Sequence, residues 1–256
     1  MFPKVLSIGD FFLPTYGLLV TLGFLAALWV TLRLARRQGL PAEPITNLVV
    51  YCALAGMAGA KLTMFLFDWR YYSEHPGEVF SLSTLRAAGV FQGGVVLAFA
   101  VAWAYVRQQK LDFFRITDLF APGLALGHAI GRLGCFAAGC CWGQACTRPW
   151  AVTFTDPAAN QLTGVPLQVP LHPTQLYESG AELLLFGWLW RATQRPHRPG
   201  AVFGQYLVAY SAVRFLVEFF RHHDQGLPLG LPLSLTQWIS ILLAGVGLWF
   251  LRRRVS

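Results

Sequence analysis

The sequence predicts an all-α polytopic membrane protein with seven transmembrane helices. Apolar residues make up 55% of the chain and charged residues only 12%, whereas a soluble domain usually carries about twice that charge. Seven apolar segments are each roughly 20 residues long, which is enough to cross a hydrocarbon core of about 30 Å. The basic residues alternate between successive connections, as they do in multi-pass proteins.

The expected helices follow one another along the whole chain. They lie near residues 14–32, 45–67, 88–106, 117–138, 174–190, 200–220 and 234–251. The first follows Met1–Asp10 without a small-residue cleavage site and runs directly into Arg33, so we expect a membrane helix and not a cleavable signal peptide. Trp69 and Trp103 lie where an aromatic belt would flank the second and third helices.

The distribution of arginine and lysine predicts the orientation. One side receives twelve basic residues, namely Arg33, Arg36, Arg37, Arg107, Lys110, Arg115, Arg191, Arg195, Arg198, Arg252, Arg253 and Arg254. The other side receives five, namely Lys4, Arg70, Arg86, Arg148 and Arg221. Because the basic side faces the cytoplasm, we expect a periplasmic N-terminus and a cytoplasmic C-terminus.

A single transmembrane domain over residues 1–256 is expected, with one periplasmic insertion at about 144–172. The localisation predicted is the bacterial inner (cytoplasmic) membrane, in contact with the lipid bilayer. The net charge of +8 could suggest nucleic acid, but its alternating placement indicates topology, so no nucleic-acid partner is expected.

Ionisable residues within the spans are the main functional signal, because such groups face the protein interior or a cavity. His128, Arg132 and Cys135 share one helical face. Two further helices carry polar stripes of their own, formed by Gln175, Glu178 and Glu182 and by Tyr210, Arg214, Glu218 and Arg221.

Three polar helix faces predict a common polar cavity. Arg132 and Arg214 in such a cavity need anions, which Glu178 and Glu218 supply in part, and a guanidinium fork also suits a phosphate. Structural ion pairs between helices are the plainer interpretation. A transporter for anions would use similar residues, but the sequence shows no internal symmetry of the kind that many transporters have.

Several ordered motifs carry a resemblance to a known family. HPTQLYES (172–179) resembles the HP-S/T-QLYE box of the bacterial prolipoprotein diacylglyceryl transferases. PTYGLLV, GAKLTMFLFD, FQGGVV, GRLGCFAAGCCWG, YSAVRFLVEFFR and LSLTQWISI are similar to further family motifs in the same order. The chain is therefore identified as a divergent, cysteine-rich member.

The resemblance implies a phosphatidylglycerol:prolipoprotein diacylglyceryl transferase. Such an enzyme moves the diacylglyceryl group of phosphatidylglycerol onto the lipobox cysteine next to a prolipoprotein signal peptide, and glycerol-1-phosphate leaves. Arg132 and Arg214 would stabilise the phosphate. The substrate-binding residues expected are Tyr16, Gln92, Gly93, Gly94, Gly143, His172, Gln175, Tyr210 and Glu218. No cofactor is expected.

The departures from the family pattern fall at polar positions. Gln92 stands where the family has a histidine often assigned as the base, and glutamine takes no proton at neutral pH. Cysteines and an alanine replace the family's asparagines and glutamate after Arg132. The base would then be His128, His172, Glu178 or the acceptor's own ionisation.

The cysteines leave four interpretations open: packing, a disulfide, a metal site and a reactive thiolate beside Arg132. Cys135, Cys140, Cys141 and Cys146 lack the paired C-x-x-C spacing of common zinc sites, so no metal is expected. Because Cys135 and Cys140 occupy polar positions of the family, we expect both to face the cavity and to act in catalysis.

Two alternative functions remain at the level of sequence. One is a paralogue that uses its own cysteines for thiol-based transfer or redox chemistry on a different acceptor. The other is a non-enzymatic lipid or anion carrier, which the buried arginines alone would also suit.

Overall fold

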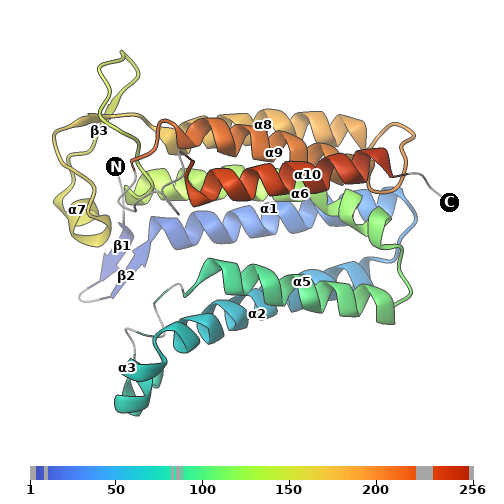
Figure 1. Cartoon of the computed structure of the whole chain (residues 1–256), viewed down its shortest axis with the longest axis horizontal. Coiled ribbons are helices and arrows are strands. Elements are labelled where there is room, and N and C mark those ends of the chain that lie inside the picture. Colours follow the sequence, from blue (N-terminus) through green and yellow to red (C-terminus); the bar gives the residue numbers. More distant parts are fainter. Residues whose placement is uncertain are drawn as a thin grey trace. The chain divides into compact units, whose positions relative to one another are not determined.

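The computed structural model describes residues 4–8, 11–81, 84, 87, 89–222 and 233–253 (Figure 1). The chain divides into two units, Met1–Leu34 with Thr117–Ser256, and Ala35–Ile116. Arg86 and Arg254, which enter the charge comparison, and most of the connection 221–233 lie outside the described residues.

Each of the seven expected segments forms a helix. These helices are α1 (Thr15–Arg37), α2 (Ala42–Phe67), α5 (Phe91–Gln108), α6 (Phe113–Ala138), α8 (Thr174–Ala192), α9 (Ala201–Glu218) and α10 (Leu235–Arg252). Among the described helices, α1, α2, α6 and α10 are long and apolar enough to cross a membrane. The helices α5, α8 and α9 are not among these four.

The first unit is a bundle of α1, α6, α8, α9 and α10 (Figure 1). Small residues let its backbones approach closely. A Cβ atom on Gly23 of α1 would lie 2.8 Å from the carbonyl oxygen of Gly127 on α6, and one on Gly247 of α10 would lie 2.9 Å from that of Gly204 on α9. Ser179 of α8 adds a 2.9 Å hydrogen bond to the carbonyl of Ala129 on α6.

The connection between α6 and α8 is ordered by a core of its own. It contains β3 (Val152–Thr153), α7 (Pro157–Thr163) and β4 (Pro170–Leu171), and the two strands pair antiparallel. Phe154, Ala159, Val165 and Leu171 form a buried apolar cluster beneath them. The insertion expected at 144–172 is therefore a packed layer.

The elements β1 (Lys4–Ile8) and β2 (Phe11–Pro14) form an antiparallel hairpin before α1. The sequence analysis anticipated neither two-stranded sheet, because strands of two to five residues carry little periodic signal. The described chain is nevertheless mostly helical, as the expected fold class requires.

The second unit pairs α2 with α5 and adds the short helices α3 (Trp69–Glu74) and η1 (Pro76–Phe80). Its two long helices cross at glycines. A Cβ atom on Gly93 would fall 1.8 Å from Oγ1 of Thr63, and one on Gly94 would fall 2.7 Å from the carbonyl oxygen of Gly56. Close helix packing thus explains why residues 93 and 94 are glycine.

Candidate functional site

Two arginines and two glutamates form a continuous ion-pair chain across three helices of the bundle. Arg132 of α6 donates from Nε to Oε2 of Glu178 on α8 over 2.5 Å, and its Nη2 contacts the same oxygen. The other oxygen of Glu178 lies 3.3 Å from Nη1 of Arg214 on α9. That Nη1 atom also lies 2.8 Å from Oε2 of Glu218, one helical turn away.

The arginines are more accessible than the carboxylates that hold them. The side chains of Arg132 and Arg214 are 11% and 12% exposed, whereas those of Glu178 and Glu218 are 2% and 4% exposed. Within the described residues, both ion pairs of Arg214 run through Nη1, so Nε and Nη2 keep donors for another anion. An anion could therefore reach the guanidinium groups without displacing the glutamates.

The first residues of α10 hold Glu218, the last member of this series of ion pairs, in place. Ser234 donates from Oγ to Oε1 of Glu218 over 2.9 Å. Oγ of Ser234 itself accepts from the backbone N–H of Gln237, and the Gln237 side chain accepts from the Ser234 backbone N–H, which completes a capping box. The hydroxyl that fixes the helix start thus also positions Glu218.

A second pair of polar side chains lies one helical turn away from Arg132 on α6 and from Glu178 on α8. Nδ1 of His128 lies 3.5 Å from Oε1 of Glu182, and Glu182 is 1% exposed. Neither carboxylate oxygen of Glu182 has a hydrogen-bond partner among the described residues. The ring of Tyr210 lies 5.5 Å from that of His128. The hydroxyl of Tyr210 is close enough to Arg214 and Glu178 to interact with them electrostatically. Tyr210 therefore lies near Arg214, and its role in substrate binding stays a prediction.

The HPTQLY segment holds the loop that follows α6. Gln175 donates from Nε2 to the carbonyl of Cys140 over 2.6 Å, and Thr174 donates from Oγ1 to the carbonyl of Cys141 over 2.8 Å. Gln175 is fully buried. Its described contact is thus with the protein backbone, and a contact with a lipid head group stays a prediction.

The cysteines gather directly beside Arg132. Nη1 of Arg132 lies 3.8 Å from Sγ of Cys135, and the sulfur atoms of Cys135, Cys140 and Cys141 lie within 4.8 Å of one another. Hydrogen bonds from the other two thiols, with the charges of Arg132 and Arg221, hold the pKa of Cys141 well below its usual range. Hydrogen bonds to the neighbouring thiols and burial raise the pKa of Cys140.

Tyr16, at the start of α1, lies at the same end of α6. A Cβ atom on Gly134 would contact its ring at 3.4 Å. Its hydroxyl is close enough to the cysteine cluster and to Arg132 to interact with them electrostatically. The structure thus places Tyr16 near Cys135 and Cys140, and a role of Tyr16 in substrate binding stays a prediction.

His172 and Gly143 meet through their backbones. The N–H of Gly143 donates to the carbonyl of His172 over 3.0 Å, and a Cβ atom on Gly143 would lie 2.5 Å from the carbonyl oxygen of Phe220. Glycine is required there because three chain segments converge. The imidazole of His172 contacts the hydroxyl of Tyr177 at 2.9 Å, and that hydroxyl accepts from Trp150 at 2.8 Å.

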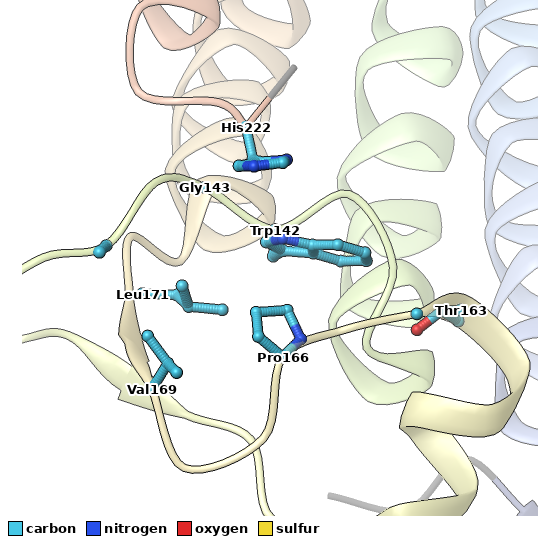
Figure 2. A pocket seen from close by; sticks show the side chains of 9 residues that line it. Trp142, Gly143, Thr163, Pro166, Val169, Leu171 and His222 are labelled. Carbon is cyan, nitrogen blue, oxygen red and sulfur yellow. The ribbon is translucent and has the colours of Figure 1, made fainter. Parts of the chain in front are cut away.

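A pocket of about 490 Å³ opens beside this convergence. Figure 2 shows the Trp142 indole between His222 and Pro166, and the rings of Trp142 and His222 stack with centroids 6.4 Å apart. The remaining lining residues are Gly143, Ala145, Thr163, Gly164, Val169 and Leu171. Gly143 is the expected site residue among them, and the lining is mainly apolar.

Gln92, Gly93 and Gly94 belong to the second unit, where they begin α5. The two glycines contact α2. Their membership of the same substrate site therefore stays a prediction, as does that of Gln92.

Several functional contacts escaped the sequence reasoning. Thr174 and Cys141 were not among the expected site residues, although both lie in motifs quoted above. Ser234 could have been found from its S-x-x-Q spacing to Gln237 at the start of an apolar run, which is the signature of a capping box. No sequence signal indicates the hydrogen bonds that link Trp150 through Tyr177 to His172, because they join segments that are distant in the sequence.

Comparisons with known proteins agree with the motifs. A family model described as prolipoprotein diacylglyceryl transferase matches residues 3–253. A phosphatidylglycerol–prolipoprotein diacylglyceryl transferase of Bordetella avium is 36% identical over 264 residues, covering 99% of this chain and 96% of its own length. Proteins of the same name from Bordetella parapertussis and Aromatoleum aromaticum are each 34% identical, covering 98% and 97% of this chain and 95% and 94% of their own lengths.

Proposed function

The chain belongs to the prolipoprotein diacylglyceryl transferase family, and we propose that it transfers the diacylglyceryl group of phosphatidylglycerol to the thiol of a prolipoprotein cysteine. It is thus a transferase of lipoprotein biosynthesis. The full-length match to this family favours that reaction over thiol-based redox chemistry and over a lipid or anion carrier.

The observation that carries the proposal is the pair of arginines held from behind by buried glutamates. Glu178 fixes both guanidinium groups at once, so their positions are set before any substrate arrives. Preorganised cations stabilise charge that develops in a transition state without reorganisation. The anion expected in front of them is the phosphate of phosphatidylglycerol.

The reaction breaks one bond and forms one. The sulfur of the acceptor cysteine attacks the glyceryl carbon that carries the phosphate, and a C–S thioether bond forms. The C–O bond to phosphate breaks, its electron pair stays on oxygen, and glycerol-1-phosphate leaves with one more negative charge than the diester. Arg132 and Arg214 would stabilise that added charge in a water-poor site.

The acceptor thiol must lose its proton for this attack. Glu178 and Glu218 are engaged in ion pairs with arginine, and His128 faces Glu182. A cation close to a thiol favours its thiolate. We therefore assign the activation of the acceptor to the electrostatic field of Arg132 and Arg214, with His172 as a further candidate for the base.

We propose seven membrane spans with the N-terminus in the periplasm and the C-terminus in the cytoplasm, in the bacterial inner membrane. The structure supports this through an alternation. Basic residues occupy the last turn of α1, α5, α8 and α10, and none occupies the last turn of α2, α6 or α9. Every second long helix thus ends on the expected cytoplasmic side.

The site and the insertion then share the periplasmic side. The loop after α6 and the HPTQLY segment, which enters the first turn of α8, both border the insertion. The lipid donor would approach through the bilayer, and the signal peptide of the prolipoprotein would present its cysteine at the same surface.

Turnover of defined substrates tests the proposal. Purified protein is incubated with phosphatidylglycerol and a peptide that contains a lipobox cysteine, and release of glycerol phosphate is measured beside thioether formation on the peptide. We expect equal amounts of both products. Folded protein that forms neither product, or that moves lipid without releasing glycerol phosphate, would contradict the proposed reaction.

A further inference from the structure

Three cysteines form a compact sulfur cluster at the end of α6. The Sγ atoms of Cys135, Cys140 and Cys141 all lie within 4.8 Å of one another. Among the described residues, this is the one such grouping of three His, Cys, Asp or Glu side chains. All five cysteines of the chain are free thiols, so none of the three is tied up in a disulfide bond.

The backbone builds this cluster in two steps. The helix ends in a Schellman motif, in which Gly139 has a φ of 79° and donates to the carbonyl of Phe136, while Cys140 donates to that of Cys135. This reversal returns Cys140 to the helix end. Cys141 then takes the left-handed conformation, with a φ of 60°, which a non-glycine residue adopts at a cost.

Hydrogen bonds from another helix hold that strained turn. Gln175 and Thr174 bind the carbonyl groups of Cys140 and Cys141, and both of these side chains are buried. Two adjacent cysteines would ordinarily point apart, and the left-handed residue lets both face Cys135. The three sulfur atoms are therefore positioned by packing that does not depend on a bound ligand.

Positively charged side chains lie next to the sulfur cluster. Nη1 of Arg132 lies 3.8 Å from Sγ of Cys135, and Arg221 adds positive charge near Cys141. A thiolate, not a thiol, is the metal ligand. Arg132 would therefore lie next to a metal–thiolate centre in this cluster and would balance part of its negative charge.

We propose that Cys135, Cys140 and Cys141 bind one soft monovalent metal ion, Cu(I), in three-thiolate coordination. Soft thiolate ligands select Cu(I) among the common ions. Sulfur atoms placed about 2.3 Å from one central ion in a plane lie about 4 Å apart, which small side-chain rotations would reach from the described positions. Each coordinating cysteine that is still a thiol loses its proton on binding.

The number of ligands distinguishes this site from a zinc site. Structural Zn²⁺ takes four protein ligands in tetrahedral geometry, and the fourth cysteine of this region is used elsewhere. Sγ of Cys146 accepts from the backbone N–H of Arg148 at 3.4 Å, and Cys146 is not part of the sulfur cluster. Three thiolates with no fourth ligand grouped beside them in the described part of the chain suit Cu(I) better.

A competition titration tests the site in the full-length protein. Protein in detergent is reduced, freed of reductant under nitrogen and titrated with Cu(I) in the presence of bicinchoninate. We expect one Cu(I) per chain in the wild type and in Cys52→Ser, whose cysteine lies on α2. Each of Cys135→Ser, Cys140→Ser and Cys141→Ser should bind Cu(I) at least tenfold more weakly.

A second measurement avoids the variants, since a serine could disturb the turn. Cu(I)-loaded and metal-free wild type are treated with N-ethylmaleimide, and modification is mapped by mass spectrometry. Cu(I) should protect the three cluster cysteines and leave the rates at Cys52 and Cys146 unchanged. Equal protection of all five thiols, Cu(I) binding retained in the three variants, or tighter binding of Zn²⁺ would overturn the proposal.

Discussion

Arg132 donates from Nε to Oε2 of Glu178 across 2.5 Å, and the second oxygen of this glutamate contacts Arg214. One carboxylate thus sets the spacing of two guanidinium groups on different helices. The carboxylate is more deeply buried than the two guanidinium groups, which are 11% and 12% exposed. The proposed phosphate site depends on this arrangement.

Removing the charge of Glu178 should therefore damage both stability and turnover. In Glu178→Gln, two arginines lose their shared partner in a buried setting, which typically costs about 3–5 kcal/mol. We expect a clear drop in melting temperature in detergent and a large loss of glycerol phosphate release. The matched control is Glu43→Gln, at an exposed position in the first turn of α2, which should leave both unchanged.

Equal melting temperatures and equal turnover in Glu178→Gln and wild type would show that the ion-pair chain is dispensable. A stable but inactive Glu178→Gln would assign the residue to positioning of the arginines alone.

Ser234→Ala should weaken the site less severely. The hydroxyl caps α10 and binds Glu218, and loss of a helix cap costs about 1 kcal/mol. We expect a modest fall in the free energy of unfolding and a several-fold fall in turnover, because Glu218 would hold Arg214 less firmly. Thr46→Ala, which removes a hydroxyl bonded within its own helix, should lower turnover less. The same loss of turnover in both variants would argue against a positioning role for Ser234.

Sequence reasoning located the helices well because their signal is local. All seven apolar segments are helical, and Arg132 and Arg214 do converge, as the i, i+4 spacing of polar residues on each helix predicted. These successes rest on periodicity and on charge, which a single sequence displays directly.

The features that sequence reasoning did not predict depend on contacts between segments that are distant in the sequence. The bridging geometry of Glu178 requires the relative rotation of three helices, which no single helix encodes. The backbone of Gly143 packs against His172 and Phe220, a convergence that no local pattern reveals. Cys141 joins the sulfur cluster through its left-handed φ, a conformation that cysteine seldom signals in sequence.

The lowered pKa of Cys141 predicts unusual reactivity below neutral pH. An ordinary thiol loses roughly two orders of magnitude in alkylation rate between pH 8 and pH 6, since its thiolate fraction falls. In the folded protein the thiolate of Cys141 persists below the usual range, so its rate with iodoacetamide should change little over this interval. Mass spectrometry resolves the rate at Cys141 from that at Cys140, whose raised pKa should keep it slow.

The internal reference for that experiment is the same protein in denaturant, where the cluster is lost. An identical pH dependence of Cys141 in folded and denatured protein would rule out the electrostatic effect of Arg132 and Arg221.

Side-specific labelling tests the proposed topology. Gln161 in the insertion and Gln194 after α8 are both exposed. In a chain whose native cysteines are replaced by serine, Gln161→Cys should react with a membrane-impermeant maleimide in intact cells that keep a permeable outer membrane. Gln194→Cys should react only after the inner membrane is opened. Labelling of residue 194 in intact cells would reverse the assignment.

The most direct measurement is the turnover of phosphatidylglycerol by Arg132→Ala and Arg214→Ala beside Arg115→Ala. Arg115 is exposed near the start of α6 and serves as a control for the loss of an arginine. Removal of one partner from a buried charged contact costs about 2–5 kcal/mol, so each site variant should release glycerol phosphate at least about tenfold more slowly, while Arg115→Ala keeps the wild-type rate. Near-normal rates in both folded site variants would contradict the phosphate role of the two arginines.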